Sequence, residues 1–253
     1  MGQQGSHLIV PAWPAPAHIK ALITTRHGGV STGPYGSFNF GMHVGDDAAA
    51  VMENRRRLTA MLPRAPVWLQ QVHGTRVLRA DDWAQSASAG EADAVQTAAV
   101  DRPCAVMMAD CLPVLFCDQA GTEVAAAHAG WRGLCAGVLE NTVAAMSAKP
   151  ELLMAYLGPA IGPAEFEVGR EVRDAFMAVE ERATAAFTPR ATAGKYYADI
   201  YALARQRLER AGVTQIYGGN YCTVTEAARF FSYRRDVTTG RMAALIWRGP
   251  NES

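Results

Sequence analysis

The sequence has no excess charge of either sign and no long apolar run. Its 24 Lys and Arg residues balance 24 Asp and Glu residues, whereas a nucleic-acid backbone normally binds a surface rich in basic residues, so we expect no nucleic-acid partner. Only Arg55, Arg56 and Arg57 cluster, and on a predicted helix we interpret them as a solvated face. No stretch approaches the roughly 18 to 20 apolar residues that a bilayer crossing needs, so we also expect no membrane span. Disorder is disfavoured, because 49% of the residues are hydrophobic.

Cysteine is scarce, and its odd number argues against a disulfide framework. There are five cysteines in 253 residues, a length at which a chain builds its own core without disulfide bonds. The N-terminus also lacks a basic region followed by an apolar stretch, which disfavours a secretory signal. We therefore expect a cytoplasmic protein with free thiols. Four of these thiols fit small buried hydrophobes, and Cys111 is the exception.

The commonest catalytic motifs are missing. There is no Gly-rich phosphate loop ending in Lys-Ser or Lys-Thr, no dinucleotide fingerprint and no His-Glu-x-x-His. Residues 29–33 match the Gly-x-Ser-x-Gly nucleophile elbow, but Gly33-Pro34-Tyr35-Gly36 disfavours the helix that must follow the serine. We interpret residues 26–36 as a long loop, and a loop of that length in a compact domain is usually functional.

Apolar runs and helical periodicities alternate along the chain. The first 20 residues hold Pro11, Pro14 and Pro16 and are expected to be an extended segment. A small polar stretch at 85–90 is predicted to be a surface loop. Because strands and helices interleave without a repeat or a linker, we predict one α/β domain over residues 1–253, with a mixed β-sheet core flanked by helices. Strands are predicted at 21–25, 67–72, 75–79, 104–108, 114–117, 123–127, 152–157, 213–217 and 242–247, and helices at 47–62, 135–146, 168–179 and 200–210.

Three potential metal ligands or catalytic groups stand at the ends of predicted buried strands. They are His73, Cys111 and His128, each beside Gly or Pro and each flanked by polar residues such as Asp110 and Arg132. A single histidine of this kind is more often a hydrogen-bonded structural residue. Three such groups at successive strand ends favour a functional site instead. A sheet brings its strand ends to one rim, where α/β folds place their sites.

The chemistry of these three side chains is open to two interpretations. Two imidazoles and one thiolate suit zinc, because three protein ligands leave the fourth tetrahedral position free for water or substrate. The separations of 38 and 17 residues do not match a known short metal motif. The rival interpretation needs no metal. It makes Cys111 the nucleophile of a hydrolase or amidase, with its thiolate stabilised by His128.

Eight segments stand out in order along the chain: Thr24-Thr25-Arg26, Gly28-Gly29-Val30-Ser31, Phe38-Asn39-Phe40-Gly41, Gln71-Val72-His73-Gly74, Ala109-Asp110-Cys111-Leu112-Pro113, His128-Ala129-Gly130-Trp131-Arg132-Gly133, Gly158-Pro159-Ala160-Ile161-Gly162 and Phe230-Phe231-Ser232-Tyr233-Arg234-Arg235. Together they resemble the laccase-domain family, whose members are also called multicopper polyphenol oxidases, purine nucleoside phosphorylases and peptidoglycan editing factors. The resemblance runs in order from about Leu22 to Trp247, which is nearly the whole chain. One departure is Val237, which stands where members commonly have Gly, and a valine does not comfortably adopt positive φ.

The resemblance implies a zinc ion held by His73, Cys111 and His128. It also implies phosphorolysis of adenosine, inosine, guanosine and methylthioadenosine to the base and ribose-1-phosphate, with adenosine deamination as a second activity. We hypothesise that Arg26 and Arg132 bind phosphate, because both lie in Gly-rich segments near the site and guanidinium matches phosphate oxygens.

Other substrate and proton-transfer residues are less well defined. Asn39 and Arg56 are weaker candidates for substrate contacts. Zinc deaminases pair the metal with a His-x-Glu acid/base, and no histidine here is followed by x-Glu. Asp93 and Asp110 are the nearest substitutes along the sequence.

Three alternatives remain. A copper-dependent polyphenol oxidase is the family's older description, but a multicopper centre needs many histidines and this chain has six. Copper could still occupy the zinc site, because divalent copper generally binds N and S donors more tightly. The second alternative is a cytoplasmic cysteine amidase that edits UDP-muramyl-peptide precursors through Cys111. The third is a binding module without catalysis.

Overall fold

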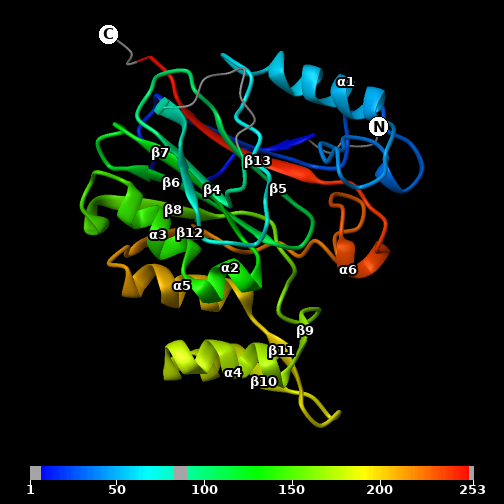
Figure 1. Cartoon of the computed structure of the whole chain (residues 1–253), viewed down its shortest axis with the longest axis vertical. Coiled ribbons are helices and arrows are strands. Elements are labelled where there is room, and N and C mark those ends of the chain that lie inside the picture. Colours follow the sequence, from blue (N-terminus) through cyan, green and yellow to red (C-terminus); the bar gives the residue numbers. More distant parts are fainter. Residues whose placement is uncertain (1–6, 83–89, 251–253) are drawn as a thin grey trace.

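The computed structural model describes residues 7–82 and 90–250, which form a mixed α/β fold (Figure 1). The largest sheet has six strands in the order β12-β8-β6-β7-β4-β3. Its outer pairs β3/β4 and β12/β8 are parallel and its inner pairs are antiparallel, so the predicted mixed sheet is confirmed. The strands are β3 (Val77–Arg79), β4 (Ala94–Thr97), β6 (Leu112–Asp118), β7 (Val124–Ala129), β8 (Leu153–Leu157) and β12 (Gln215–Gly218).

A second sheet joins the two ends of the chain. It is antiparallel, with the order β1-β2-β13-β5, and β13 near the C-terminus separates β2 from β5. A third, smaller antiparallel sheet lies with helix α4 at one end of the molecule's long axis (Figure 1). The second sheet contains β1 (Leu8–Ile9), β2 (Ile19–Thr24), β5 (Cys104–Met108) and β13 (Met242–Arg248), and the third contains β9 (Glu167–Gly169), β10 (Phe187–Pro189) and β11 (Lys195–Ala198).

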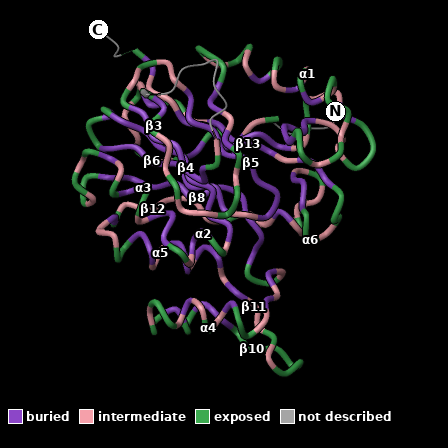
Figure 2. The backbone as a smooth tube through the Cα atoms, viewed as in Figure 1, coloured by how far each residue is buried: buried purple, intermediate pink, exposed green. Residues whose placement is uncertain are grey.

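The two larger sheets pack face to face, which explains their continuous apolar strands. In β6, Leu115 and Cys117 face the other sheet, while Val114 and Phe116 face the helices. In β13 the same alternation sends Ile246 toward the six-stranded sheet. Both faces of these strands are therefore buried, as the purple central strands of Figure 2 show. A strand covered on both sides reads as a continuous apolar run, as the sequence predicted.

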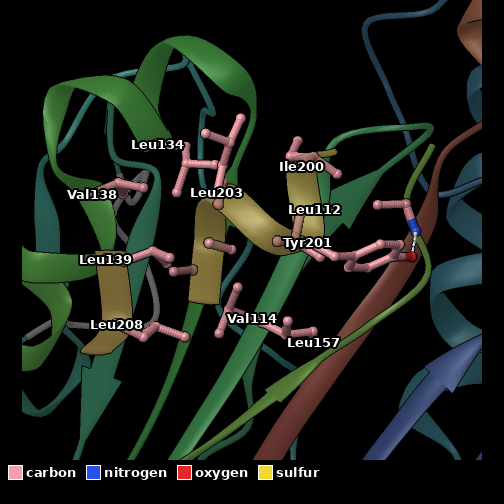
Figure 3. Packing of buried hydrophobic residues seen from close by; sticks show 14 of the residues in the cluster. Leu112, Val114, Leu134, Val138, Leu139, Leu157, Ile200, Tyr201, Leu203 and Leu208 are labelled. Carbon is pink, nitrogen blue, oxygen red and sulfur yellow. Dashed lines mark hydrogen bonds between the residues drawn. The ribbon is translucent and has the colours of Figure 1, made fainter. Parts of the chain in front are cut away.

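Helices α2, α3 and α5 cover the outer face of the six-stranded sheet. Figure 3 shows Leu134, Val138 and Leu203 from the helices packed over Val114 from β6. Tyr201 extends this layer, and its hydroxyl accepts a hydrogen bond from the Ala160 amide at 2.8 Å. The helices are α2 (Trp131–Ala136), α3 (Val138–Ala145), α4 (Arg170–Val179) and α5 (Ile200–Arg210), with 3-10 turns at Gly33–Tyr35, Ala80–Asp82, Pro150–Leu152 and Glu181–Ala186.

Helix α1 (Ala48–Thr59) covers the outer face of the four-stranded sheet. Asp47 caps it through its side chain, and Leu58 packs with Phe38 and Phe40 against that sheet. Helix α6 (Tyr233–Asp236) lies in the long connection before β13. No helix in the described part of the chain has the length and apolar character that a membrane crossing needs.

Three sequence predictions of secondary structure were wrong. Residues 67–72 form isolated bridges at Val67 and Gln70 instead of a strand. The predicted helix 135–146 is two helices, because Gly137 adopts φ 105° and interrupts it. The helix predicted at 168–179 begins two residues later, at Arg170 in α4, because Val168 belongs to strand β9. All but residue 90 of the loop predicted at 85–90 lies outside the described residues. So do the first six residues of the extended segment predicted at 1–20.

Val237 and Arg55 differ from the sequence prediction, the first in backbone conformation and the second in side-chain contacts. Val237 adopts φ 59° directly after α6, contrary to the expectation that valine avoids positive φ. Arg55 does not belong to a solvated face. It donates to the Phe40 carbonyl at 2.8 Å and stacks over the Trp68 ring. Burial lowers the pKa of Arg55 to about 10, whereas Arg56 and Arg57 pair with Glu53 at the surface as expected.

Candidate metal centre

The three predicted ligands come together at one rim of the six-stranded sheet. Cys111 directly precedes β6, and His128 lies in the neighbouring strand β7, opposite Pro113. His73 lies in the loop before β3. The potential ligand atoms of the three side chains lie within 4.8 Å of one another.

The spacing of these atoms fits a tetrahedral zinc ion. Cys111 Sγ lies 3.7 Å from His73 Nε2. Ordinary Zn–S and Zn–N bonds meeting at a tetrahedral angle separate the sulfur from the nitrogen by about 3.6 Å. His128 is buried, Cys111 is half-buried and His73 is exposed. The group is therefore closed on the protein side and open on the side of His73.

Asp93 ties the two histidines together. Its carboxylate accepts hydrogen bonds from the backbone amides of Val72, His73 and Gly74 at 3.2, 2.9 and 2.6 Å. These bonds hold His73 in the left-handed conformation, φ 59°, that aims its ring at the site. The same carboxylate lies 2.9 Å from His128 Nδ1. Asp93 thus places the Nδ1 proton of His128 and leaves its Nε2 lone pair for a metal.

Gln71 anchors the loop that carries His73. Its amide nitrogen donates to the Met107 carbonyl at 2.8 Å, and its amide oxygen accepts from the Met107 amide at 2.7 Å. One side chain therefore satisfies both backbone groups of Met107, as a neighbouring strand would. This bond pair replaces the ladder that was predicted for 67–72, and it fixes the loop to β5 four residues before Cys111.

Two glycines let helix α2 approach the ligands. A Cβ atom at Gly130 would stand 2.7 Å from His73 Cδ2 and 3.0 Å from Cys111 Sγ. At Gly133 it would stand 2.7 Å from the Gly74 carbonyl oxygen. Real Cβ atoms do not come so close, so both positions need glycine for the packing seen here.

The half-buried Cys111 and the buried His128 side chains shift each other's pKa in the metal-free protein. Burial alone raises the pKa of the Cys111 thiol, but the charge of His128 and hydrogen bonds from His128 and His73 outweigh burial and lower it to about 6. For His128, burial favours the neutral ring, while Cys111 and Asp93 favour the cation and raise its pKa to about 9. The side chains therefore form a thiolate–imidazolium pair at neutral pH, and a metal would replace the proton on His128.

Of the predicted substrate residues, the structure brings only Arg132 to this site. Arg132 lines the cavities beside His73 and Cys111, and its guanidinium stacks on the Trp131 ring. Arg26 instead donates to the Gly36 and Ala227 carbonyls and stacks on Phe231.

Asn39 is fully buried outside these cavities. Its side-chain oxygen accepts from the Arg241 amide at 2.8 Å, so Asn39 shapes the backbone at a residue that does line the cavity. Arg56, the other weak candidate, is paired with Glu53 on α1.

Both candidate acid/base carboxylates are occupied by internal hydrogen bonds. Asp93 is fully buried in the network described above. Asp110 accepts from the Thr223 hydroxyl at 2.5 Å and from the Arg234 amide at 2.6 Å. Its φ of 87° turns the chain from β5 into Cys111. Asp93 therefore positions His73 and His128, and Asp110 positions the segment that carries Cys111.

Sequence reasoning missed the cavity residues His43, Tyr233 and Arg241. Tyr233 carried a signal, since it stands in one of the family segments. His43 and Arg241 carried none that marked this site, because tertiary folding alone brings them beside Cys111.

Fold and site together define a mixed α/β protein with a His–His–Cys group able to bind a metal. The chain belongs to the family described as multi-copper polyphenol oxidoreductase laccase, whose model matches residues 20–249. The resemblance seen in the sequence segments is thereby confirmed.

Relatives match almost the whole chain. Purine nucleoside phosphorylase YfiH of Escherichia coli (strain K12) is 59% identical over 244 residues, covering 96% of this chain and 99% of that protein. Purine nucleoside phosphorylase PA4543 of Pseudomonas aeruginosa is 55% identical and covers 94% and 97%. The crystal structure of Neisseria meningitidis protein NMB0706 has a TM-score of 0.93 at 53% identity, covering 96% of this chain and 100% of that one.

Proposed function

We propose that this protein is a zinc-dependent purine nucleoside phosphorylase. The observation that carries the proposal is the convergence of His73, Cys111 and His128 at a cavity that also receives Arg132. The names of relatives at 55% and 59% identity support this activity. The substrates would be phosphate and adenosine, inosine, guanosine or methylthioadenosine.

The donor set suits the proposed metal. One soft thiolate and two imidazoles match zinc, so Cys111, His73 and His128 would hold the ion, which would supply Lewis-acid chemistry when bound. Around it, the Arg132 guanidinium would hold phosphate oxygens in a bidentate manner. A phosphate oxygen attacks ribose C1′ as the bond from C1′ to the base nitrogen breaks, and the departing base takes a proton from solvent. Asp93 would hold His128 in one tautomer throughout.

The test is incubation of the purified protein with adenosine, with and without phosphate. Chromatography resolves adenine, ribose-1-phosphate and inosine. Adenine and ribose-1-phosphate that form only with phosphate support the proposal. Absence of every product would contradict it. We expect inosine to form more slowly than adenine, because Asp93 and Asp110, the only acid/base candidates from the sequence, are held in internal hydrogen bonds.

A cysteine amidase acting on UDP-muramyl-peptide precursors is the second candidate. The specific observation in its favour is that Cys111, His128 and Asp93 have the order of a nucleophile, a base and an orienting acid, with 2.9 Å between His128 and Asp93. Release of L-serine from the UDP-linked substrate tests it. An amidase of this kind stays active after chelation of zinc, whereas the proposed phosphorylase does not.

Metal analysis separates zinc from the copper alternative. In the described residues, His73, Cys111 and His128 are the one group of three or more potential ligands. The imidazoles of His18 and His27 contact the Gly121 and Ala228 carbonyls instead. We expect zinc after cytosolic expression, and phenol oxidation restored by copper would favour the oxidase. Five free cysteines suit the reducing cytoplasm that we propose as the protein's location.

A further inference from the structure

Two cavities meet at Cys111, and they differ in character. The larger has a volume of about 490 Å³ and the smaller about 240 Å³. They share His73, Ala109, Cys111, Arg132 and Tyr233. A ligand at the metal centre therefore has access to two compartments.

The smaller compartment has a mostly apolar wall, although Arg132 and Arg234 also border it. The rings of Trp131 and Phe166 and the side chains of Ile161 and Ile200 line it. Its one carboxylate, that of Asp110, is already bonded to Thr223 and Arg234. Flat apolar groups suit such a lining.

The larger compartment is lined by positively charged or titratable nitrogen groups. His43, Arg132 and Arg241 face it, and no carboxylate among the described residues lines it. Gln71 also borders it, but its amide is bonded to Met107. The cations here therefore have no carboxylate partner on the described part of the cavity wall, where the anionic group is the Cys111 thiolate.

Arg241 is held in place by the surrounding backbone. Asn39 accepts its amide proton, and its Nη1 donates to the Thr239 and Gly240 carbonyls at 3.0 and 3.1 Å. These bonds use one of the three guanidinium nitrogens, and no hydrogen bond within the described chain occupies Nε or Nη2. Burial lowers the pKa of Arg241, while the charges of Cys111 and Asp110 raise it, which places the guanidinium within electrostatic range of the metal centre.

His43 stands near Arg241 at the exposed rim. Burial, then the charges of Arg241 and Arg55, lower the pKa of His43. Its ring makes no hydrogen bond to the described residues. The imidazole is therefore free to donate to a ligand bound between it and Arg241.

We propose that His43 and Arg241 form, together with Arg132, a subsite for a tetrahedral oxyanion in the larger compartment. The subsite rests on the proposed function only for the identity of the anion as the phosphate that attacks the nucleoside. The purine then occupies the apolar compartment on the other side of Cys111. This arrangement places the attacking phosphate and the departing base in different compartments, as displacement at C1′ requires.

The experiment is isothermal titration of inorganic phosphate into the zinc-loaded protein, with sulfate as a competitor. Variants Arg241→Gln and His43→Gln are compared with Arg64→Gln, which removes an exposed arginine outside both cavities. We expect the phosphate affinity to fall about 10- to 100-fold in Arg241→Gln, since charge-assisted hydrogen bonds are lost. It should fall about threefold to tenfold in His43→Gln, and Arg64→Gln should match the wild type.

Steady-state kinetics supply the second readout. The KM for phosphate should rise in both cavity variants while the KM for adenosine stays within about twofold. Zinc content and thermal midpoint serve as fold controls. His43→Gln keeps the test valid if Arg241→Gln disturbs the backbone at Thr239, because no internal hydrogen bond of the described chain involves the His43 ring.

The outcomes separate this subsite from the proposed function. Unchanged phosphate affinity and unchanged phosphate KM in both cavity variants would overturn the subsite and leave phosphorolysis standing. Phosphate binding that is lost in Arg241→Gln, in a protein that never cleaves adenosine, would support the subsite and contradict the proposed function.

Discussion

The ring of His73 stands edge-on to the ring of His128, with the centroids 4.9 Å apart and the planes at 72°. His73 lies in a loop and His128 in β7, and neither is held in this arrangement by its own segment alone. The Asp93 carboxylate contacts the backbone of one and the ring of the other. The candidate metal centre therefore depends on Asp93, which is not one of the three potential ligands.

Replacement of this carboxylate should weaken metal binding. We expect Asp93→Asn to lower zinc affinity about 10- to 100-fold, because partners that orient ligating histidines typically contribute that much. Competition with a chromophoric chelator measures it. Asp174→Asn, an exposed carboxylate on α4, is the control. Equal zinc affinity in Asp93→Asn and the wild type would show that the histidines are held by other contacts.

Gly130 should be required for metal binding rather than for folding. Its φ of −61° and ψ of 154° suit alanine, so Gly130→Ala acts through its methyl group against His73 and Cys111. We expect at least a tenfold loss of zinc affinity and about 1 kcal/mol of destabilisation from the altered N-cap. Gly169→Ala is the matched control, since Gly169 is also an N-cap and its Cβ would meet the flexible Glu171 side chain. The idea fails if both variants bind zinc as the wild type does.

Removal of the metal should expose a reactive thiolate. With a pKa of about 6, Cys111 is ionised above that pH, so alkylation of the chelated protein should be half-maximal near pH 6 rather than near 8.5, as for an ordinary thiol. Bound zinc should block the reaction. Burial raises the pKa of Cys104, and raises that of Cys117 to about 12, so both should stay unmodified. Mass spectrometry after iodoacetamide treatment identifies the modified residue, and equal labelling with and without zinc would argue against Cys111 as a ligand.

Asn54 should be a major stabilising residue of the Gly-rich loop. Its buried amide accepts from the Val30 amide and donates to Ser31 Oγ and to the Ser37 and Asn39 carbonyls. We expect Asn54→Ala to lower the free energy of unfolding by about 2 to 4 kcal/mol, because several buried groups lose their partner. Urea denaturation measures this. Asn141→Ala, which loses one exposed bond to Thr75, should cost about 1 kcal/mol or less, and equal losses in the two variants would contradict this account.

Local sequence was sufficient to single out the three potential ligands, and it was insufficient to find the residues that support them. His73, Cys111 and His128 follow or end apolar runs, and that position is visible in the sequence. The sequence suggested Asp93 only as a candidate acid/base. Its supporting role was not visible there, because its hydrogen bonds reach residues 20 and 35 positions away. No periodicity encodes such contacts.

The contacts of the arginine side chains were the features that the sequence predicted least well. The half-buried Arg55 side chain contacts the Phe40 carbonyl and the Trp68 ring. Arg241 lies beside Cys111 only because β13 pairs with β5. A helical position or a Gly-rich neighbour does not reveal which carbonyl or ring an arginine will meet. Arg26 shows the same point, since its Gly-rich loop places it against Phe231.

The place of β13 between β2 and β5 has a consequence for biosynthesis. Because β13 is the last of the described strands along the chain, β2 and β5 each keep an unpaired edge on the ribosome until β13 has been synthesised. Arg241, one residue before that strand, arrives at the same moment. An ion that binds before β13 has paired would meet an incomplete cavity, so we expect the site to mature only after β13 has joined β2 and β5.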